Sequence, residues 1–159
     1  MGKKFLALVA ACAMMFTMSA TAFAASPDDA SQEVQVQESS VTARASNYFS
    51  GGTGTLNTMA GSESKHDPIS SGSVPHNATV TDVEVRVTVS RGSIPFYLVV
   101  VSPTGQKASR YIGTSQTLHF DEFNDMSPDG KWFIYIYNTG SQFTDVSTAN
   151  ARMTVRYNY

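Results

Sequence analysis

The sequence predicts an all-β protein, an antiparallel β-sandwich that follows a cleaved signal peptide. Three observations support this. Residues 79–90 alternate, with valines at every second position from Val83 to Val89, which is typical of a strand with one face on a core and one in water. Residues 94–102 and 131–138 are apolar on both faces, which indicates central strands. Turns rich in glycine and proline separate these runs, as in sandwiches and barrels.

The first 24 residues have the features of a secretory signal. Lys3 and Lys4 supply a positive start, an apolar run extends from Phe5 to about Met18, and residues 22–24 read AFA. A charged start, an apolar centre and a small-x-small end are what signal peptidase recognises. We therefore expect cleavage after residue 24 and secretion of the mature chain.

Two alternatives to a cleaved signal are a membrane anchor and a lipid anchor. A membrane anchor needs roughly 20 apolar residues, and this run is shorter. Lipidation would use Cys12, which ends a lipoprotein-like box, Val-Ala-Ala-Cys. The apolar run continues past Cys12, and a cut there would leave a very short signal, so a cleaved secretory signal is the preferred interpretation.

The mature chain must be stabilised by its core. Removing 24 of the 159 residues leaves 135 and takes away Cys12, the one cysteine, so no disulfide is expected. Loss of Lys3 and Lys4 leaves nine of the 11 basic residues against 13 acidic ones, a net charge of −4. No cluster of Lys and Arg indicates a nucleic-acid partner.

Along the chain, residues 25–46 form a polar, acidic linker that cannot bury enough apolar surface to fold by itself. Residues 47–159 form the predicted sandwich domain. Its first strand, at 47–57, is weak because glycines interrupt it. The alternating strand at 79–90 and the apolar strand at 94–102 follow. A type I turn is expected at Ser-Pro-Thr-Gly, residues 102–105.

The last two predicted strands are also patterned. Residues 131–138 place one set of side chains on one face and a second set on the other: Trp132, Ile134 and Ile136 against Phe133, Tyr135 and Tyr137. Asp129 and Gly130 mark a tight turn before this strand. Residues 151–159 alternate again and point three residues inward: Met153, Val155 and Tyr157.

Several motifs, in this order, resemble the P-domain (P/Homo B domain) of the subtilisin-like proprotein convertases. They are VPHNATV at 74–80, which enters the alternating strand, a strand ending in SPTG at 102–105, and FN at 123–124 followed by GKW at 130–132 and YNT at 137–139. The resemblance covers residues 68–157. It implies a jelly-roll-like sandwich, often with bound calcium, and no catalysis by the module.

The chain departs from that family in its segment before the Ser-Pro turn, which is also about two residues longer than is usual there, and in its domain context. Residues 89–95 read VSRGSIP, without the histidine and the Gly-Asp-Leu that usually follow the valine strand. Family P-domains also follow a protease domain, which this chain lacks. The first departure weakens the calcium expectation, and the second suggests a stand-alone module.

Catalysis is not expected. The three histidines, His66, His76 and His119, are far apart in the sequence, and no nucleophile-elbow motif accompanies the many serines. The same wide spacing, with no cysteine in the mature chain, argues against zinc. A small hydrolase is the least favoured alternative.

One loop is a candidate calcium site. Four carboxylates lie close together before Trp132, and calcium takes six to eight oxygen ligands: Asp121, Glu122, Asp125 and Asp129. The alternative is a solvated acidic loop with a turn at its end.

Aromatic residues are frequent in the second half of the chain, and Tyr135 and Tyr137 are the candidate binding residues. Exposed rings suit a sugar or a protein ligand. The alternative is packing between two sheets, because these residues lie on a predicted central strand.

These observations predict a secreted, non-catalytic module that binds an extracellular protein or the cell surface. Two alternatives stay open: an accessory factor for a separately encoded secreted subtilisin-like protease, and a carbohydrate- or cell-envelope-binding module.

Overall fold

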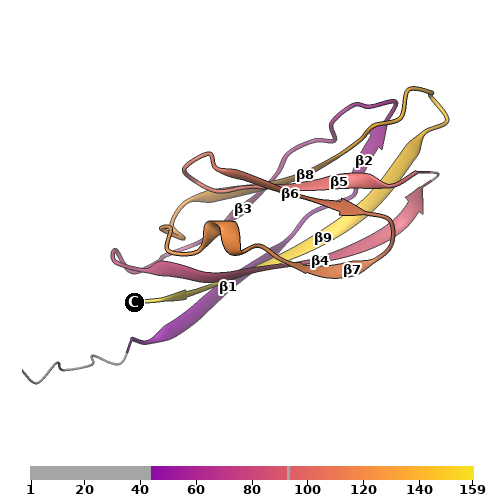
Figure 1. The fold of residues 1–159 in the computed structure, drawn as a ribbon. Helices are drawn as coiled ribbons and strands as arrows, with labels where there is room; N and C mark the ends of the chain where they lie inside the picture. The colour runs from indigo at the N-terminus through magenta and orange to yellow at the C-terminus, as the bar shows by residue number, and fades with distance from the viewer. Residues whose placement is uncertain (1–43, 93) are drawn as a thin grey trace, which may run out of the picture. The chain divides into compact units, whose positions relative to one another are not determined.

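Two antiparallel sheets pack face to face in the part of the chain that the computed structural model describes, residues 44–92 and 94–159 (Figure 1). This confirms the predicted all-β sandwich. The predicted signal peptide and residues 25–43 of the predicted linker lie outside the described residues. Within the described ranges no helix is long and apolar enough to span a membrane.

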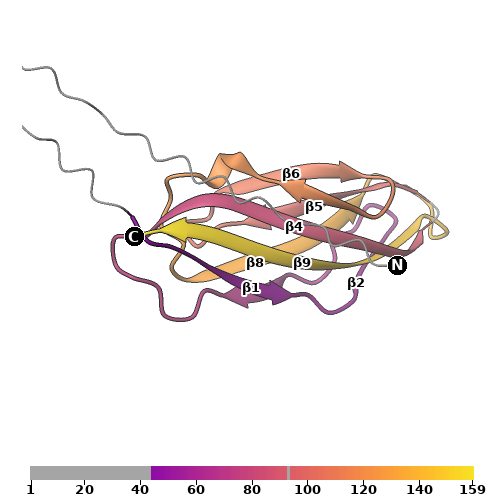
Figure 2. The same cartoon turned by 90° about the horizontal axis from the view of Figure 1, so that it is seen from below.

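The first sheet has the strand order β1-β9-β4-β7, and β2 also pairs with β9. Its strands are β1 (Ser46–Gly52), β2 (Leu56–Met59), β4 (Thr79–Gly92), β7 (Gln116–His119) and β9 (Val146–Asn158). Figure 2 shows β1, β9 and β4 side by side. The single strand predicted at 47–57 is divided into β1 and β2. The break falls at Gly52, the last residue of β1, and at Gly54 in the loop that follows.

The second sheet has the order β3-β8-β5-β6. Its strands are β3 (Asp67–Ser70), β5 (Phe96–Val101), β6 (Lys107–Ile112) and β8 (Lys131–Asn138), and a single 3-10 turn, η1 (Asp121–Phe123), precedes β8. The two predicted central strands, β5 and β8, are the two inner strands of this sheet. A hydrogen bond from the Gly105 N–H to the Ser102 carbonyl closes the predicted turn between β5 and β6.

Inward-facing side chains of the alternating strands fill the space between the sheets. Val83, Val85 and Val87 of β4 are buried, as predicted. Val80 is buried too, although it lies three positions before Val83, an odd offset that would place the two on opposite faces of a regular strand. A register irregularity between Val80 and Asp82 accommodates this spacing, because a bulge inserts one extra residue and restores the inward direction.

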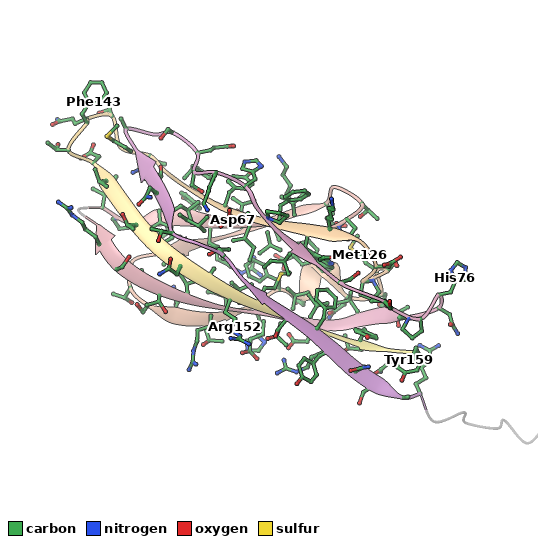
Figure 3. The ribbon with its side chains drawn as sticks, turned by 180° about the vertical axis from the view of Figure 1, so that it is seen from behind. Asp67, His76, Met126, Phe143, Arg152 and Tyr159 are labelled. Carbon is green, nitrogen blue, oxygen red and sulfur yellow. The ribbon has the colours of Figure 1, made fainter. Side chains whose placement is uncertain are left out.

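The inward residues of β8 and β9 complete the core. Trp132, Ile134 and Ile136 are fully buried, and the Trp132 indole N–H donates to the Pro128 carbonyl at 3.0 Å. The predicted inward residues of β9 are also buried: Met153, Val155 and Tyr157. The opposite faces of these strands are therefore free to carry function. Phe143 lies at one end of the sandwich, and His76 and Tyr159 lie at the other (Figure 3).

A close contact joins β1 to β3 and seals one side of the core. A Cβ atom on Gly51 would lie 2.6 Å from Cγ2 of Ile69, which is buried. A Cβ on the next residue, Gly52, would meet nothing closer than the Ala151 carbonyl at 3.8 Å. Only the first of these two glycines is required by packing.

We expect Gly51→Ala to lower the free energy of unfolding by about 1–3 kcal/mol, the usual cost of overpacking. Gly52→Ala, its matched control, should be neutral or stabilising by about 0.5–1 kcal/mol, because alanine restricts the unfolded chain. Urea unfolding of both variants measures the difference. Equal stability of the two variants would contradict the role given to Gly51.

Candidate functional site

The outer side of the second sheet carries a tyrosine face, defined here by Tyr97, Tyr111, Tyr135 and Tyr137. Since side chains alternate along a strand, the residues between the buried ones of β5, β6 and β8 all point outward. Tyr97 comes from β5, Tyr111 from β6, and the other two from β8. The predicted pair on β8 thus lies on the side of the sheet away from the core.

Three of these tyrosines form one row across three strands. Tyr97 is the direct cross-strand partner of Tyr111 on one side and of Tyr137 on the other. The rings of Tyr97 and Tyr137 are stacked, 5.1 Å apart between centroids and 14° from parallel. Tyr111 meets Tyr97 edge-on at 5.2 Å and 62°. These contacts hold the three rings in a fixed order.

The two residues predicted from the sequence differ in exposure. Tyr137 is half-buried in the row. Tyr135 is only 4% exposed, because the ring of His66 stacks on it at 4.0 Å. His66 in turn lies 3.0 Å from the Glu63 carboxylate. Tyr135 therefore supports the face, whereas Tyr137 and its row form its accessible part.

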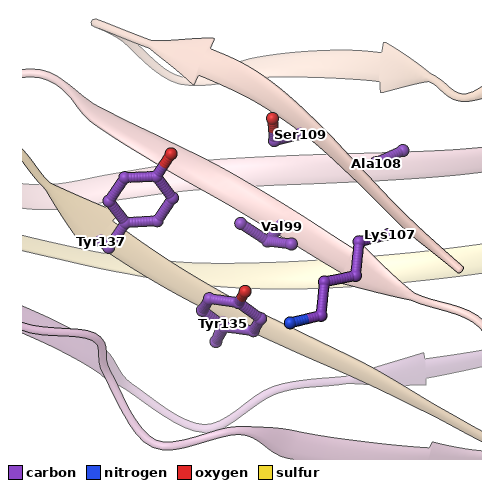
Figure 4. A pocket seen from close by; sticks show the side chains of 6 residues that line it. All are labelled: Val99, Lys107, Ala108, Ser109, Tyr135 and Tyr137. Carbon is purple, nitrogen blue, oxygen red and sulfur yellow. The ribbon is translucent and has the colours of Figure 1, made fainter. Parts of the chain in front are cut away.

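A shallow groove of about 200 Å³ runs beside the row (Figure 4). Tyr135 and Tyr137 line one side, and Lys107 and Ser109 of β6 line the other. Val99, which is 4% exposed, forms part of the floor. The lining residues thus carry apolar surface, two aromatic rings, three hydroxyls and one ammonium group.

The phenol hydroxyls of the tyrosine face are available to a ligand. Within the described part of the chain none of the four hydroxyls forms a hydrogen bond with another residue. Since no buried side-chain polar atom there lacks a partner, these hydroxyl oxygens are not buried. A tyrosine hydroxyl both donates and accepts. Water or a bound partner can therefore complete these hydrogen bonds.

The candidate calcium residues lie in and after η1, where one carboxylate is already paired. Both oxygens of Glu122 accept hydrogen bonds from Arg110, at 2.6 and 2.9 Å. These bonds lower the pKa of Glu122 below its ordinary value of 4.5, against the opposing effect of partial burial, and raise the pKa of Arg110. The guanidinium also lies 4.7 Å above the ring of Phe120, so this pair anchors η1 to β6.

The other three candidates do not complete a donor set with Glu122. Asp121 lies 3.9 Å from Arg110, Asp125 has a left-handed backbone with φ of 63°, and Asp129 accepts from the Ser71 hydroxyl at 3.2 Å. No three His, Cys, Asp or Glu side chains among the described residues are grouped as metal ligands. The arrangement does not fit a calcium ion held by all four residues, and calcium stays a prediction.

The histidines occupy three separate places. His66 covers Tyr135, and His76 lies in the exposed loop before β4. His119 lies 3.0 Å from Asp82 on the first sheet. No hydroxyl is bonded to its second ring nitrogen within the described ranges, so a serine–histidine pair is not formed there.

Sequence reasoning did not select Tyr97, Tyr111, Lys107 or Ser109 for the site. The strand pattern places Tyr97 opposite the buried face of β5, but its two neighbours depend on sheet order. β8 pairs with β5 although β6, β7 and η1 intervene in the sequence. Only the register brings these residues together.

The Arg110–Glu122 pair predicts a pH-dependent stability. A carboxyl with a lowered pKa stabilises the folded state above its unfolded pKa and loses this effect as the pH falls through the folded pKa. We expect Glu122→Gln to be less stable than the wild type near neutral pH, by less than about 1 kcal/mol since the pair is partly exposed. The difference should vanish well below pH 4.5.

Urea unfolding at neutral and acidic pH measures this difference. Asp121→Asn is the matched control, because its carboxylate is 86% exposed and lies 3.9 Å from Arg110. It should have the smaller effect. A Glu122→Gln difference that persists at low pH would show that the pair does not act through charge.

Comparisons with known proteins show the fold and no family. The chain matches no protein-family model and no curated protein. Among solved structures it is similar to that of FlhE, with a TM-score of 0.51 and 18% identity over 74% of this chain and all of that chain. A structure described as Bacillus endospore appendages, disulfide-linked pili, has a TM-score of 0.42 and 16% identity over 74% of this chain and 91% of that one. Neither is a P-domain, and that resemblance stays a prediction.

Proposed function

We propose that this protein is a secreted, non-catalytic module that binds a protein partner or the cell surface through its tyrosine face. The observation that carries the proposal is the row of Tyr111, Tyr97 and Tyr137 on the outside of the second sheet. Secretion rests on the predicted signal peptide. The resemblance to P-domains supports a non-catalytic role.

The row offers more than stability to the sheet. Cross-strand aromatic pairs do stabilise sheets, by roughly 0.2–1 kcal/mol, and Tyr97 with Tyr137 fits that role. Tyr111 also pairs with Tyr97, but 58% of it is exposed, so most of its surface is left for a partner. An exposed ring held at the end of an ordered row is the kind of residue that anchors an interface.

The row is also pre-organised for binding. Tyrosine has few rotatable bonds and loses little side-chain entropy when a partner binds. Tyr97 and Tyr137 lie on the two inner strands of the second sheet, and their mutual stacking fixes their rings. A ligand therefore meets a surface that is already ordered, which lowers the cost of association.

The size of the groove favours a macromolecule as the ligand. Sites that enclose small molecules usually measure about 300–1,000 Å³, whereas this groove measures about 200 Å³ and is shallow. Lys107 and Ser109 supply a polar edge beside the apolar floor. An apolar centre with a polar rim is the usual make-up of a protein-binding surface.

Tyr111→Ala tests the proposal, with Tyr48→Ala as its matched control. The two tyrosines are similarly exposed, 58% and 64%, but Tyr48 lies on β1 of the other sheet. We expect Tyr111→Ala to weaken binding to washed cells or secreted proteins of the source organism by about tenfold, as loss of an anchor residue does. Tyr48→Ala should bind as the wild type does.

Binding is measured with purified, labelled mature protein, and unfolding curves of both variants exclude a loss of fold. Tyr137→Phe adds a second readout, because it removes one hydroxyl and keeps the stacked ring. A loss of binding by Tyr48→Ala equal to that of Tyr111→Ala would contradict the assignment to the tyrosine face.

A further inference from the structure

The outer side of the first sheet carries charged side chains in rows set by the β4–β9 register. In one row Asp82 lies opposite Arg156. The Arg156 guanidinium donates to Asp82 at 2.7 Å and to Glu84 at 3.1 Å. These bonds raise its pKa, and positive charge in this part of the face is matched by carboxylates.

Four residues along β4 from Asp82, Arg86 lies directly opposite Arg152 of β9. Directly opposed residues have their Cβ atoms about 4.5–5.5 Å apart, and like charges at such positions are unfavourable. Neither arginine pairs with a carboxylate in the described part of the chain. Arg152 makes one long hydrogen bond, at 3.4 Å to the Ser50 hydroxyl. Both arginines are exposed on this face, and their guanidinium groups serve different sides of the strand pair: Arg152 reaches Ser50 of β1, whereas Arg86 lies beside β7 (Figure 3 labels Arg152).

A polar hollow of about 220 Å³ lies beside Arg86. It is lined by Arg86 and by five uncharged residues, without a carboxylate: Val87, Thr88, Ser115, Gln116 and Thr117. Ser115 accepts the Val89 N–H at 2.9 Å, so its own hydrogen is free for another acceptor. The hollow therefore combines one cation with several neutral donors, the set that an oxyanion requires.

The positive charge extends along the strands. Arg91 of β4 lies opposite Thr148 of β9 in the register. Residues 86–92 and 146–152 contain no Asp or Glu. The whole chain has a net charge of −2. A strip with three arginines and no acidic residue on an acidic protein favours a ligand with several negative groups.

We propose that Arg86 and Arg152, with the hollow beside Arg86, bind phosphate groups of an anionic polymer that carries no bases. A planar guanidinium gives two parallel hydrogen bonds to an oxyanion such as phosphate. Single-stranded nucleic acid would also need rings for its bases to stack on. The outward positions of β4 and β9 in this strip carry none, only residues such as Thr88, Asn150 and Thr148.

The test is binding of inorganic polyphosphate to the purified mature protein at low salt, by isothermal titration calorimetry. We expect Arg86→Gln and Arg152→Gln each to weaken binding by about tenfold, the loss of a hydrogen bond to a charged group. Lys131→Gln is the control, because it removes the same charge from an exposed position on β8. It should change the affinity by roughly twofold at most.

Other outcomes overturn the proposal. Absence of polyphosphate binding would refute the site. An equal loss of affinity with Lys131→Gln would reduce the binding to a general electrostatic effect. Equal affinity for polyglutamate would assign the pair to carboxylates. Tighter binding of a single-stranded oligonucleotide, lost in the same two variants, would assign it to nucleic acid. Both arginines are exposed and neither pairs with a carboxylate in the described residues, so thermal unfolding should show the two variants about as stable as the wild type.

Discussion

The long antiparallel pairing of β4 with β9 is the constraint on which the first sheet depends. It extends from Thr79 opposite Asn158 to Gly92 opposite Ser147. Every other strand of that sheet attaches to one of the two: β1 and β2 pair with β9, and β7 pairs with β4. A slip of one residue in this register would turn every core side chain of one strand outward. Burial of valines and of Met153 between the sheets therefore sets the register firmly.

The same register determines the chemistry of the outer surface. Because Val85 must lie opposite Met153 and Val87 opposite Ala151 in the core, Arg86 is placed opposite Arg152 outside. The second sheet behaves in the same way. Pairing of Leu98 with Ile136 in the core puts Tyr97 beside Tyr137 on the outer side. In both sheets the order of the functional residues follows from packing on the far side of the strand.

This coupling explains what could be predicted from the sequence. The long strands have enough alternating or doubly apolar residues to show their period, and the inward set of β8, Trp132, Ile134 and Ile136, follows from it directly. The strands β3, β6 and β7 were not predicted. Each has four to six residues and at most two buried apolar side chains: Ile69 in β3, two in β6 and none in β7. Such short runs pair because their neighbours offer a free edge, not because of their own pattern.

The candidate sites show the same limit. Alternation places Tyr135 and Tyr137 on one side of β8, but their exposure depends on His66 and Tyr97, which come from other elements. The acidic loop was selected because four carboxylates are close in sequence. Glu122 is instead bound by Arg110, eleven residues before Asp121 and on a strand whose pattern is weak. Nearness in sequence predicts a shared loop, whereas partners across strands decide whether its charges are free.

The two outer faces are physically independent surfaces of one core. Stacked sheets lie about 10 Å apart, and fully buried residues such as Leu98 and Val85 fill the space between them. Substitutions this far apart with no shared partner usually add in their effects. Tyrosine side chains on one face and arginine side chains on the other therefore present different chemistry without mutual cost, and a change in one face leaves the other as it was. The sandwich thus places an aromatic surface and a cationic surface back to back on a single domain.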